Sequence, residues 1–139
     1  MQDQLPPDTV IKNVKSDGNC FYRAVQVFMG HGELTYLVLK ALVYEFACHE
    51  RELTEQLGNF TVITTRILTD NKWSYDEDIT LTANFLQRDI HIYMDTYPSG
   101  RCEVFTSEFG KSGGPPIMLL HTGGWEHGHF KAIVTTSGK

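Results

Sequence analysis

Residues 17–24 read Asp17-Gly18-Asn19-Cys20-Phe21-Tyr22-Arg23-Ala24, a short polar turn that leads at once into an apolar pattern. The apolar positions recur at helical spacing, so a helix is predicted from Cys20 to the glycines at 30 and 32. A thiol at a helix N-terminus faces unpaired N–H groups and the positive end of the helix dipole, and both favour the thiolate. Gly18 allows the turn backbone angles that are closed to other residues. The backbone N–H groups of Asp17, Gly18, Asn19 and Cys20 are therefore expected to form an oxyanion hole beside a cysteine nucleophile.

A simpler interpretation of the same residues stays open. Asp17 and Asn19 are common helix-capping residues, and an unpaired cysteine at a helix start is often a small buried hydrophobe. A lone cysteine becomes a candidate nucleophile only when a histidine elsewhere in the chain can reach it.

The 139 residues suit one domain, residues 1–139, with a single hydrophobic core. The chain carries 12 Lys and Arg against 17 Asp and Glu, a net charge of -5, and has no basic block, which argues against a nucleic-acid-binding protein. An acidic surface fits a positively charged protein partner, because opposite potentials steer encounter. We expect a monomer.

The number and spacing of the cysteines indicate a reducing compartment, and the hydropathy pattern predicts neither a membrane span nor a signal peptide. The three cysteines, Cys20, Cys48 and Cys102, are odd in number and form no CxxC pair. No apolar run approaches the length of a membrane span, and residues 1–7 do not resemble a signal peptide. The expected location is the cytoplasm, of a host cell if the source is a virus or a bacterial effector.

The first half of the chain has mostly helical patterns after a short edge strand or arm within residues 8–15. The strongest helical pattern has an apolar stripe, formed by Leu34, Leu37, Val38, Ala41, Leu42 and Phe46. This second helix is expected to pack against the Cys20 helix. A further helix is predicted around residues 62–68, and another, with an acidic first turn, from Asp76 to Leu86.

From residue 89 the hydrophobic period changes to two. Residues 90–94 and 102–106 alternate on either side of a Pro-Ser-Gly turn and predict a strand pair. The apolar run 117–120 is typical of a buried strand, and residues 130–134 of a closing strand. The predicted fold class is α+β, with a small mixed, mostly antiparallel sheet flanked by helices.

Of the six histidines, His121, His127 and His129 gather around the glycine-rich loop 121–129. A zinc site built on these three is one possibility, although only Glu126 is nearby as a fourth ligand. The alternative concerns His129 alone. It stands at the start of a predicted strand, from which an imidazole can project over the Cys20 thiol.

The residues 17–24 and the Gly128-His129-Phe130 stretch resemble the nucleophile and histidine motifs of the ovarian tumour (OTU) family of cysteine proteases, most of which are deubiquitinases. The order of the elements between these motifs is also similar to that family. The resemblance implies a papain-like architecture and a catalytic set that includes Cys20, His129 and Asp17. It also implies no cofactor or metal.

The resemblance further implies a thiol isopeptidase acting on ubiquitin, polyubiquitin chains or ubiquitin-like modifiers. Cys20 would attack the carbonyl carbon of a C-terminal glycine, and His129 would protonate the leaving lysine amine. We expect Trp125 and Gly128, beside His129, to line the narrow channel that such a glycine tail needs.

Residue 131 departs from the family pattern. Many members have an acid or an amide two residues after the histidine, where it can orient the imidazole. This chain has Lys131, a cation that would oppose imidazolium formation. Asn13, Asp8 and Glu126 are then the candidates for the orienting group. The departure also supports an alternative, a catalytically weak or inactive ubiquitin-binding module.

Overall fold

The computed structural model describes residues 8–94, 101–123 and 128–135. Its helices are α1 (Cys20–Phe28), the short 3-10 helix η1 (Glu33–Thr35), α2 (Tyr36–His49), α3 (Arg51–Leu57), α4 (Phe60–Leu68) and α5 (Asp76–Leu86). Its strands are β1 (Thr9–Lys12), β2 (Ile90–Met94), β3 (Cys102–Phe105), β4 (Ile117–Thr122) and β5 (His129–Thr135). None of the helices in these ranges is long and apolar enough to cross a membrane.

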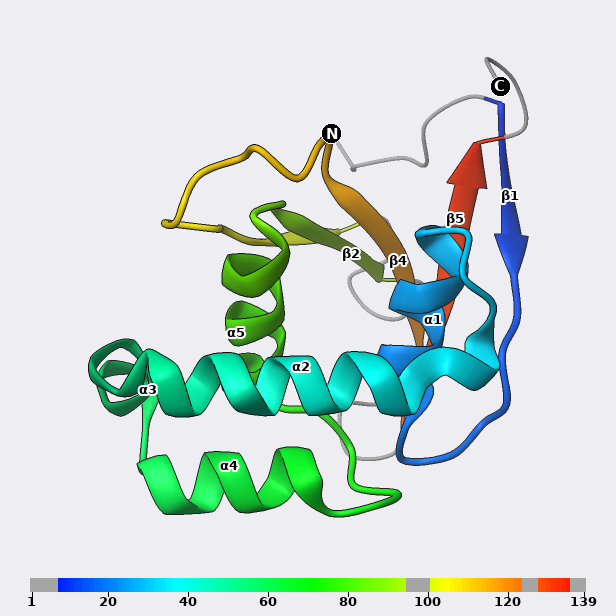
Figure 1. Cartoon of the computed structure of the whole chain (residues 1–139). Helices are drawn as coiled ribbons and strands as arrows, with labels where there is room; N and C mark the ends of the chain where they lie inside the picture. The colour runs from blue at the N-terminus through cyan, green and yellow to red at the C-terminus, as the bar shows by residue number, and fades with distance from the viewer. Residues whose placement is uncertain (1–7, 95–100, 124–127, 136–139) are drawn as a thin grey trace.

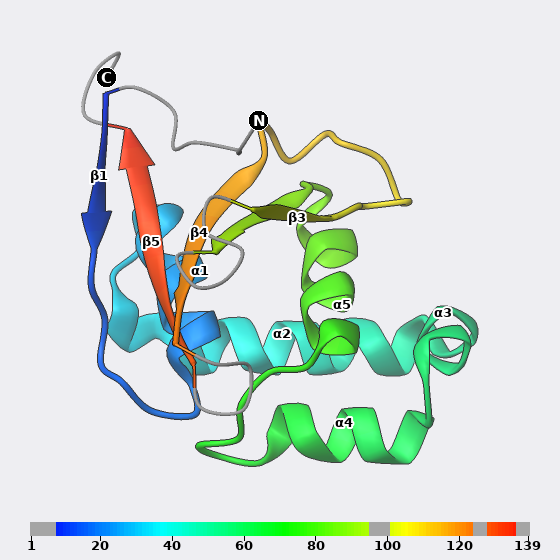
Figure 2. The ribbon, with the colours of Figure 1, turned by 180° about the vertical axis from the view of Figure 1, so that it is seen from behind.

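The strands form one mixed sheet in the order β1-β5-β4-β2-β3. Among the described residues β2 and β4 pair in parallel and the other three pairs are antiparallel, so the predicted α+β class and mixed sheet are confirmed. The predicted strand pair is β2 with β3, and the turn between them lies outside the described residues. Helices α1 and α5 lie against the sheet, and α2 crosses over both of them (Figures 1 and 2).

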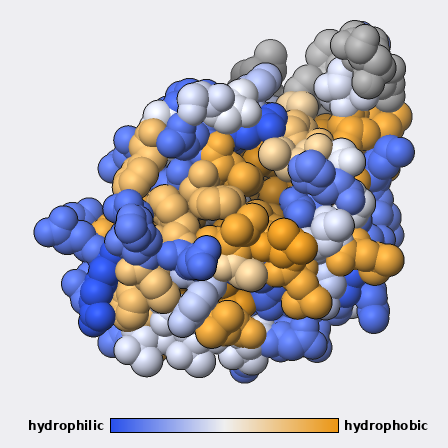
Figure 3. Space-filling model, in the orientation of Figure 1, coloured by the Kyte–Doolittle hydropathy of each residue, from blue (hydrophilic) through white to orange (hydrophobic). Residues whose placement is uncertain are grey.

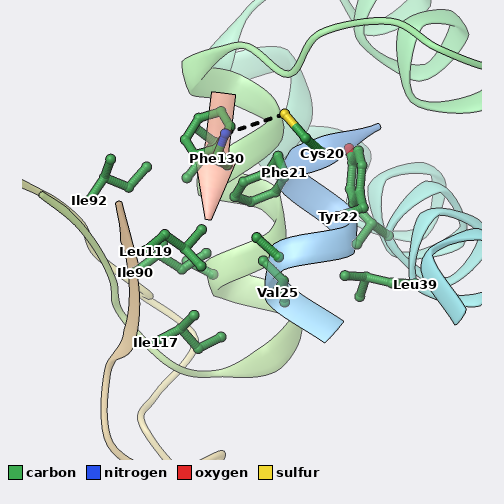
Figure 4. Close-up of a cluster of buried hydrophobic side chains, with 14 of the residues drawn as sticks. Cys20, Phe21, Tyr22, Val25, Leu39, Ile90, Ile92, Ile117, Leu119 and Phe130 are labelled. Atoms are coloured by element: carbon green, nitrogen blue, oxygen red, sulfur yellow. Dashed lines mark hydrogen bonds between the residues drawn. The ribbon is translucent and has the colours of Figure 1, made fainter. Parts of the chain in front are cut away.

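The main core fills the space between α1, α2 and the central strands (Figure 4). Helix α1 is buried on nearly all sides, from Cys20 to Gln26. The Phe130 ring of β5 meets the edge of the Phe21 ring at a centroid distance of 5.4 Å. Such an aromatic pair adds about 1 kcal/mol to the burial of its two rings. This packing fixes the start of α1 against the start of β5.

Helix α2 buries a different face from the one that carries its apolar stripe. Its buried residues are Leu39, Lys40, Val43 and Ala47. Leu34 of η1 is 82% exposed and Leu37 of α2 is 59% exposed, and Figure 3 shows apolar side chains gathered on this side of the molecule. Apolar residues surround most of this helix, so the hydrophobic period did not distinguish its faces.

Two further details differ from the sequence expectations. Helix α3 was not predicted, because its seven residues are mostly polar and bury only Thr54. Gly18 is also not among the residues with positive φ, so special backbone angles do not explain this glycine. A Cβ at this position would overlap the backbone of Asn71, and the close approach of that segment is what requires glycine here.

Candidate active site

Cys20 is the first residue of α1 and is 1% exposed. Its sulfur accepts a hydrogen bond from the backbone N–H of Phe130, with 3.4 Å between nitrogen and Sγ (Figure 4). Phe130 directly follows His129 at the start of β5. The fold therefore brings the thiol to the strand residue that adjoins the candidate base, although the two lie at opposite ends of the sequence.

The burial of Cys20 opposes the thiolate that the sequence predicts at this position. Burial raises the pKa of Cys20 to about 11 and outweighs the N–H groups of Phe130, Cys20 and Phe21, which lower the pKa. The nearby Asp17 carboxylate adds to the rise. A thiol with so high a pKa ionises at neutral pH only if a base takes its proton.

His129 is oriented by Asn13, which lies on the segment between β1 and the nucleophile turn. Its Nε2 lies 2.7 Å from Oδ1 of Asn13, and the same oxygen accepts the N–H of Val14 at 2.9 Å. Because this oxygen is an acceptor, Nε2 carries the proton, and Nδ1 is left as the acceptor nitrogen. Nδ1 is buried and has no hydrogen-bond partner among the described residues. In this tautomer Nδ1 is the ring nitrogen that can accept a proton.

The surroundings of His129 favour the neutral ring. Desolvation by burial lowers the pKa of His129, and the Lys131 cation lowers it further, while the Val14 carbonyl and Asp17 oppose the shift. Lys131 thus acts on the imidazole as its charge predicted. A neutral imidazole is the form that can take a proton from Cys20.

Each backbone N–H of the predicted oxyanion hole already has an acceptor within the protein. The N–H groups of Asp17, Asn19 and Cys20 donate locally, to the Lys15 carbonyl, the Asp17 carboxylate and the Asp17 carbonyl respectively. The N–H of Gly18 donates to Oδ1 of Asn71 at 2.6 Å. Since the Asn71 side chain belongs to an exposed residue, this is the bond that an incoming oxyanion could displace with least rearrangement.

The Asp17 carboxylate supports the turn and does not hold the imidazole. Oδ2 accepts from Nη2 of Arg23 at 2.9 Å, and Oδ1 accepts from the N–H of Asn19 at 3.0 Å. Burial opposes its ionisation, but Arg23 and the Asn19 N–H outweigh this and hold the pKa of Asp17 below its usual value. Asn19, the N-cap residue of α1, makes no side-chain capping bond, so the simple capping interpretation is wrong for its side chain.

Residues 15–130 match the model of the OTU-like cysteine proteases. The chain belongs to this family. No curated protein sequence matches the chain at a significant level.

Solved structures of OTU domains share the fold. The OTUD1 OTU domain has a TM-score of 0.74 and 18% identity, over 90% of this chain and 85% of that one. The Qalyub virus OTU protease has a TM-score of 0.73 and 15% identity, over 97% and 98% of the two chains. The Hazara virus OTU, solved with ubiquitin bound, has a TM-score of 0.68 and 19% identity, over 99% and 96%.

In this OTU-family chain, Trp73 fixes the residue before the histidine, a role that the sequence did not reveal. Its indole Nε1 donates to the carbonyl of Gly128 at 2.7 Å. Gly128 is buried beside His129, whereas Trp125 and Glu126 lie outside the described residues, so the channel of Gly128 and Trp125 stays a prediction. Asp8 lies at an exposed position just before β1.

The zinc hypothesis concerns residues that the structure describes only in part. His121 packs its ring against Phe130, at a centroid distance of 4.8 Å, and His127 lies outside the described ranges. Within residues 8–94, 101–123 and 128–135, no three His, Cys, Asp or Glu side chains gather as metal ligands.

A surface hollow of about 450 Å³ lies between α4 and the segment that leads to α5. Val62 and Thr65 line it from α4, and Trp73 and Tyr75 line it from the segment that follows. Val62 and Tyr75 are more than half exposed. Trp73 connects this hollow to Gly128, the residue before His129.

Proposed function

We propose that this chain is a deubiquitinase that hydrolyses the isopeptide bond after the C-terminal glycine of ubiquitin or a ubiquitin-like modifier. The observation that carries the proposal is that Asn13, just after β1, bonds to His129 at the start of β5, while the next residue, Phe130, bonds to the Cys20 thiol. Asn13 occupies the orienting role that residue 131 does not fill, and Asp17 supports the turn.

The reaction proceeds in two halves. Nδ1 of His129 takes the Cys20 proton as the sulfur attacks the glycine carbonyl carbon, and the oxyanion replaces Asn71 at the Gly18 N–H. The C–N bond then breaks, and His129 gives its proton to the leaving lysine amine. Water, deprotonated by His129, attacks the resulting thioester, and the thiol leaves with that proton. Gly128 lies beside His129, where the glycine tail must enter.

Ubiquitin is the proposed partner because the Hazara virus OTU and an OTU deubiquitinase from Wolbachia pipientis, which share this fold, were both solved with ubiquitin bound. We place the body of ubiquitin on the hollow beside Trp73, from which its C-terminal tail reaches Gly128 and Cys20.

A ubiquitin with an electrophile in place of its C-terminal carboxylate tests the proposal directly. We expect one covalent adduct on the wild-type protein and none on Cys20→Ala, measured by intact mass. Cys48→Ala is the matched control, because Cys48 is exposed and would react first if exposure alone decided. An adduct that persists in Cys20→Ala and disappears in Cys48→Ala would refute the assignment.

Asn13→Ala should lower kcat about 10- to 100-fold while KM stays nearly constant, because the imidazole loses the oxygen that orients it. Hydrolysis of a fluorogenic ubiquitin amide measures both constants. Asn59→Ala is the control, since Asn59 also accepts a backbone N–H through Oδ1, that of Val62, but lies at the N-cap of α4. Equal loss in both variants would show that Asn13 only stabilises the fold.

Val62→Asp should raise KM for the same substrate about tenfold, with kcat unchanged, because it puts a charge on the apolar surface where we place ubiquitin. Leu37→Asp is the control, with similar exposure on α2, 59% against 55%. If the two variants raise KM equally, the docking surface is misplaced.

A second candidate function is a ubiquitin-binding module without useful activity. It is favoured by the high pKa of the Cys20 thiol and by the internal acceptors of all four turn amides. Binding of ubiquitin chains by the reduced wild-type protein, with no cleavage of any linkage and no adduct with the electrophilic ubiquitin, would establish this candidate instead.

A further inference from the structure

Lys40 is a buried cation that the proposed reaction does not use. It lies on the inner face of α2 and is 4% exposed. Its Nζ donates to Oδ1 of Asn19 at 3.0 Å and to the Thr69 carbonyl at 2.9 Å. A charged side chain buried to this degree needs partners that compensate its desolvation, and both of these belong to segments beside the active site.

Asn19 is the link between Lys40 and the nucleophile. Its Oδ1 also accepts the N–H of Asn71 at 3.1 Å, and its Nδ2 donates to Asp70 at 3.1 Å. The backbone of Asn19 adjoins Cys20, so the side chain that Lys40 holds belongs to the residue immediately before the thiol. The Asn19 side chain thus joins the turn to the segment that follows α4.

The Lys40 ammonium also stabilises the end of α4. Thr69 is the C-cap residue of that helix, where unpaired carbonyls and the negative end of the dipole favour a cation. Burial lowers the pKa of Lys40, while the carboxylates of Asp70, Asp17 and Asp78 oppose the shift. The Tyr22 ring, with its centroid 5.7 Å from Nζ, adds a cation–π contact.

We propose that Lys40 is a positioning residue of the active site, which holds the Cys20 turn in register with the 69–71 segment through the Asn19 carboxamide. This inference rests on the proposed deubiquitinase function. Lys40 does not touch substrate or the reacting atoms. It sets where the turn amides and the sulfur stand relative to β5.

The kcat and KM of Lys40→Met for a ubiquitin amide test the proposal. The concentration of active enzyme is taken from the fraction that forms an adduct with the electrophilic ubiquitin. We expect kcat to fall about 10- to 100-fold with KM within about twofold, because small misplacement of a nucleophile slows the chemical step and leaves remote binding intact. Thr54→Val is the matched control. It removes a fully buried hydroxyl that donates to the Ala47 and Glu50 carbonyls, and should leave kcat unchanged.

Asn19→Ala and the double variant separate positioning from general stability. If Lys40 acts through Asn19, Asn19→Ala lowers kcat similarly, and the double variant is no worse than the more impaired single variant. If the loss of kcat in the double variant is the product of the losses in the two single variants, the two residues act independently and the proposal is overturned. Asn19→Ala also provides the test if Lys40→Met does not fold, since it keeps the lysine.

Amide hydrogen exchange decides the proposal independently of activity. In Lys40→Met or Asn19→Ala, exchange in residues 17–20 should be at least about tenfold faster than in the wild type, with β2 and β4 unchanged. Unchanged exchange in the turn would refute the positioning role even if both variants were slow enzymes. If the variants show this faster exchange but the wild-type protein cleaves no ubiquitin substrate, the proposed function is refuted and the positioning role of Lys40 is not.

Discussion

His129→Ala should lower kcat for a ubiquitin amide by about 10³-fold or more, because the reaction loses both the base that takes the thiol proton and the acid that protonates the leaving amine. Folding and ubiquitin affinity should be nearly unchanged. The N–H of Phe130, which holds the Cys20 sulfur, belongs to the backbone and stays in place. His91→Ala, at a half-buried position on β2, is the control. Loss of the folded state in His129→Ala alone would show that this histidine is structural.

The pH profile of the wild type identifies the same proton acceptor. In the proposed reaction the neutral form of His129 is the active form, and burial together with Lys131 lowers its pKa. As pH falls, kcat/KM should therefore decline only below the ordinary histidine pKa of about 6.5. Lys131→Glu replaces the cation by an anion, which favours the imidazolium, so the decline should begin at a higher pH. A profile that is the same in both proteins would show that another group titrates.

The reactivity of Cys20 toward a small alkylating agent provides an independent check of this mechanism. Because the pKa of the thiol is about 11, alkylation of the free protein should accelerate with rising pH throughout the neutral range. A plateau at acidic pH would indicate a preformed thiolate–imidazolium pair instead.

Local signals in the sequence predicted the sheet and most helices. The alternation in residues 90–94 and the apolar run 117–120 identified β2 and β4, because each strand has a strong period or a continuous buried run. The buried face of α2 was not predictable in this way. It is selected by a tertiary network in which Lys40 reaches Asn19, and a lysine in a sequence is ordinarily assigned to the exposed face.

The residues of the candidate site that belong to a local sequence motif could be predicted. Those that the fold brings together from distant segments were harder to predict. Cys20 and His129 stood out by residue type and position. The orienting group remained open among three residues because only β1–β5 pairing determines that Asn13 reaches Nε2 of His129. Asn71 and Trp73 were given no role from the sequence, since both act through contacts with residues far away along the chain.

Gly18→Ala should disrupt the nucleophile turn and lower kcat/KM by at least about 100-fold. A Cβ at residue 18 would overlap the carbonyl of Asn71, and this neighbour is backbone rather than a flexible side chain. The turn must then move away from the 71–72 segment, and Cys20 moves with it. Overpacking of this kind costs about 3 kcal/mol of stability. Thermal unfolding and ubiquitin amide hydrolysis measure the two effects.

Gly113→Ala is the control that separates a loss of stability from a loss of activity caused by displacement of the nucleophile turn. A Cβ there would overlap the backbone oxygen of Leu86, so a similar destabilisation is expected. Gly113 precedes the start of β4, however, whereas His129 pairs with Thr122 at the other end of that strand. Per folded molecule, Gly113→Ala should therefore keep wild-type kcat/KM. If both glycine variants lose activity only in proportion to the unfolded fraction, the approach of residue 71 to the turn is needed for folding and has no part in placing the thiol.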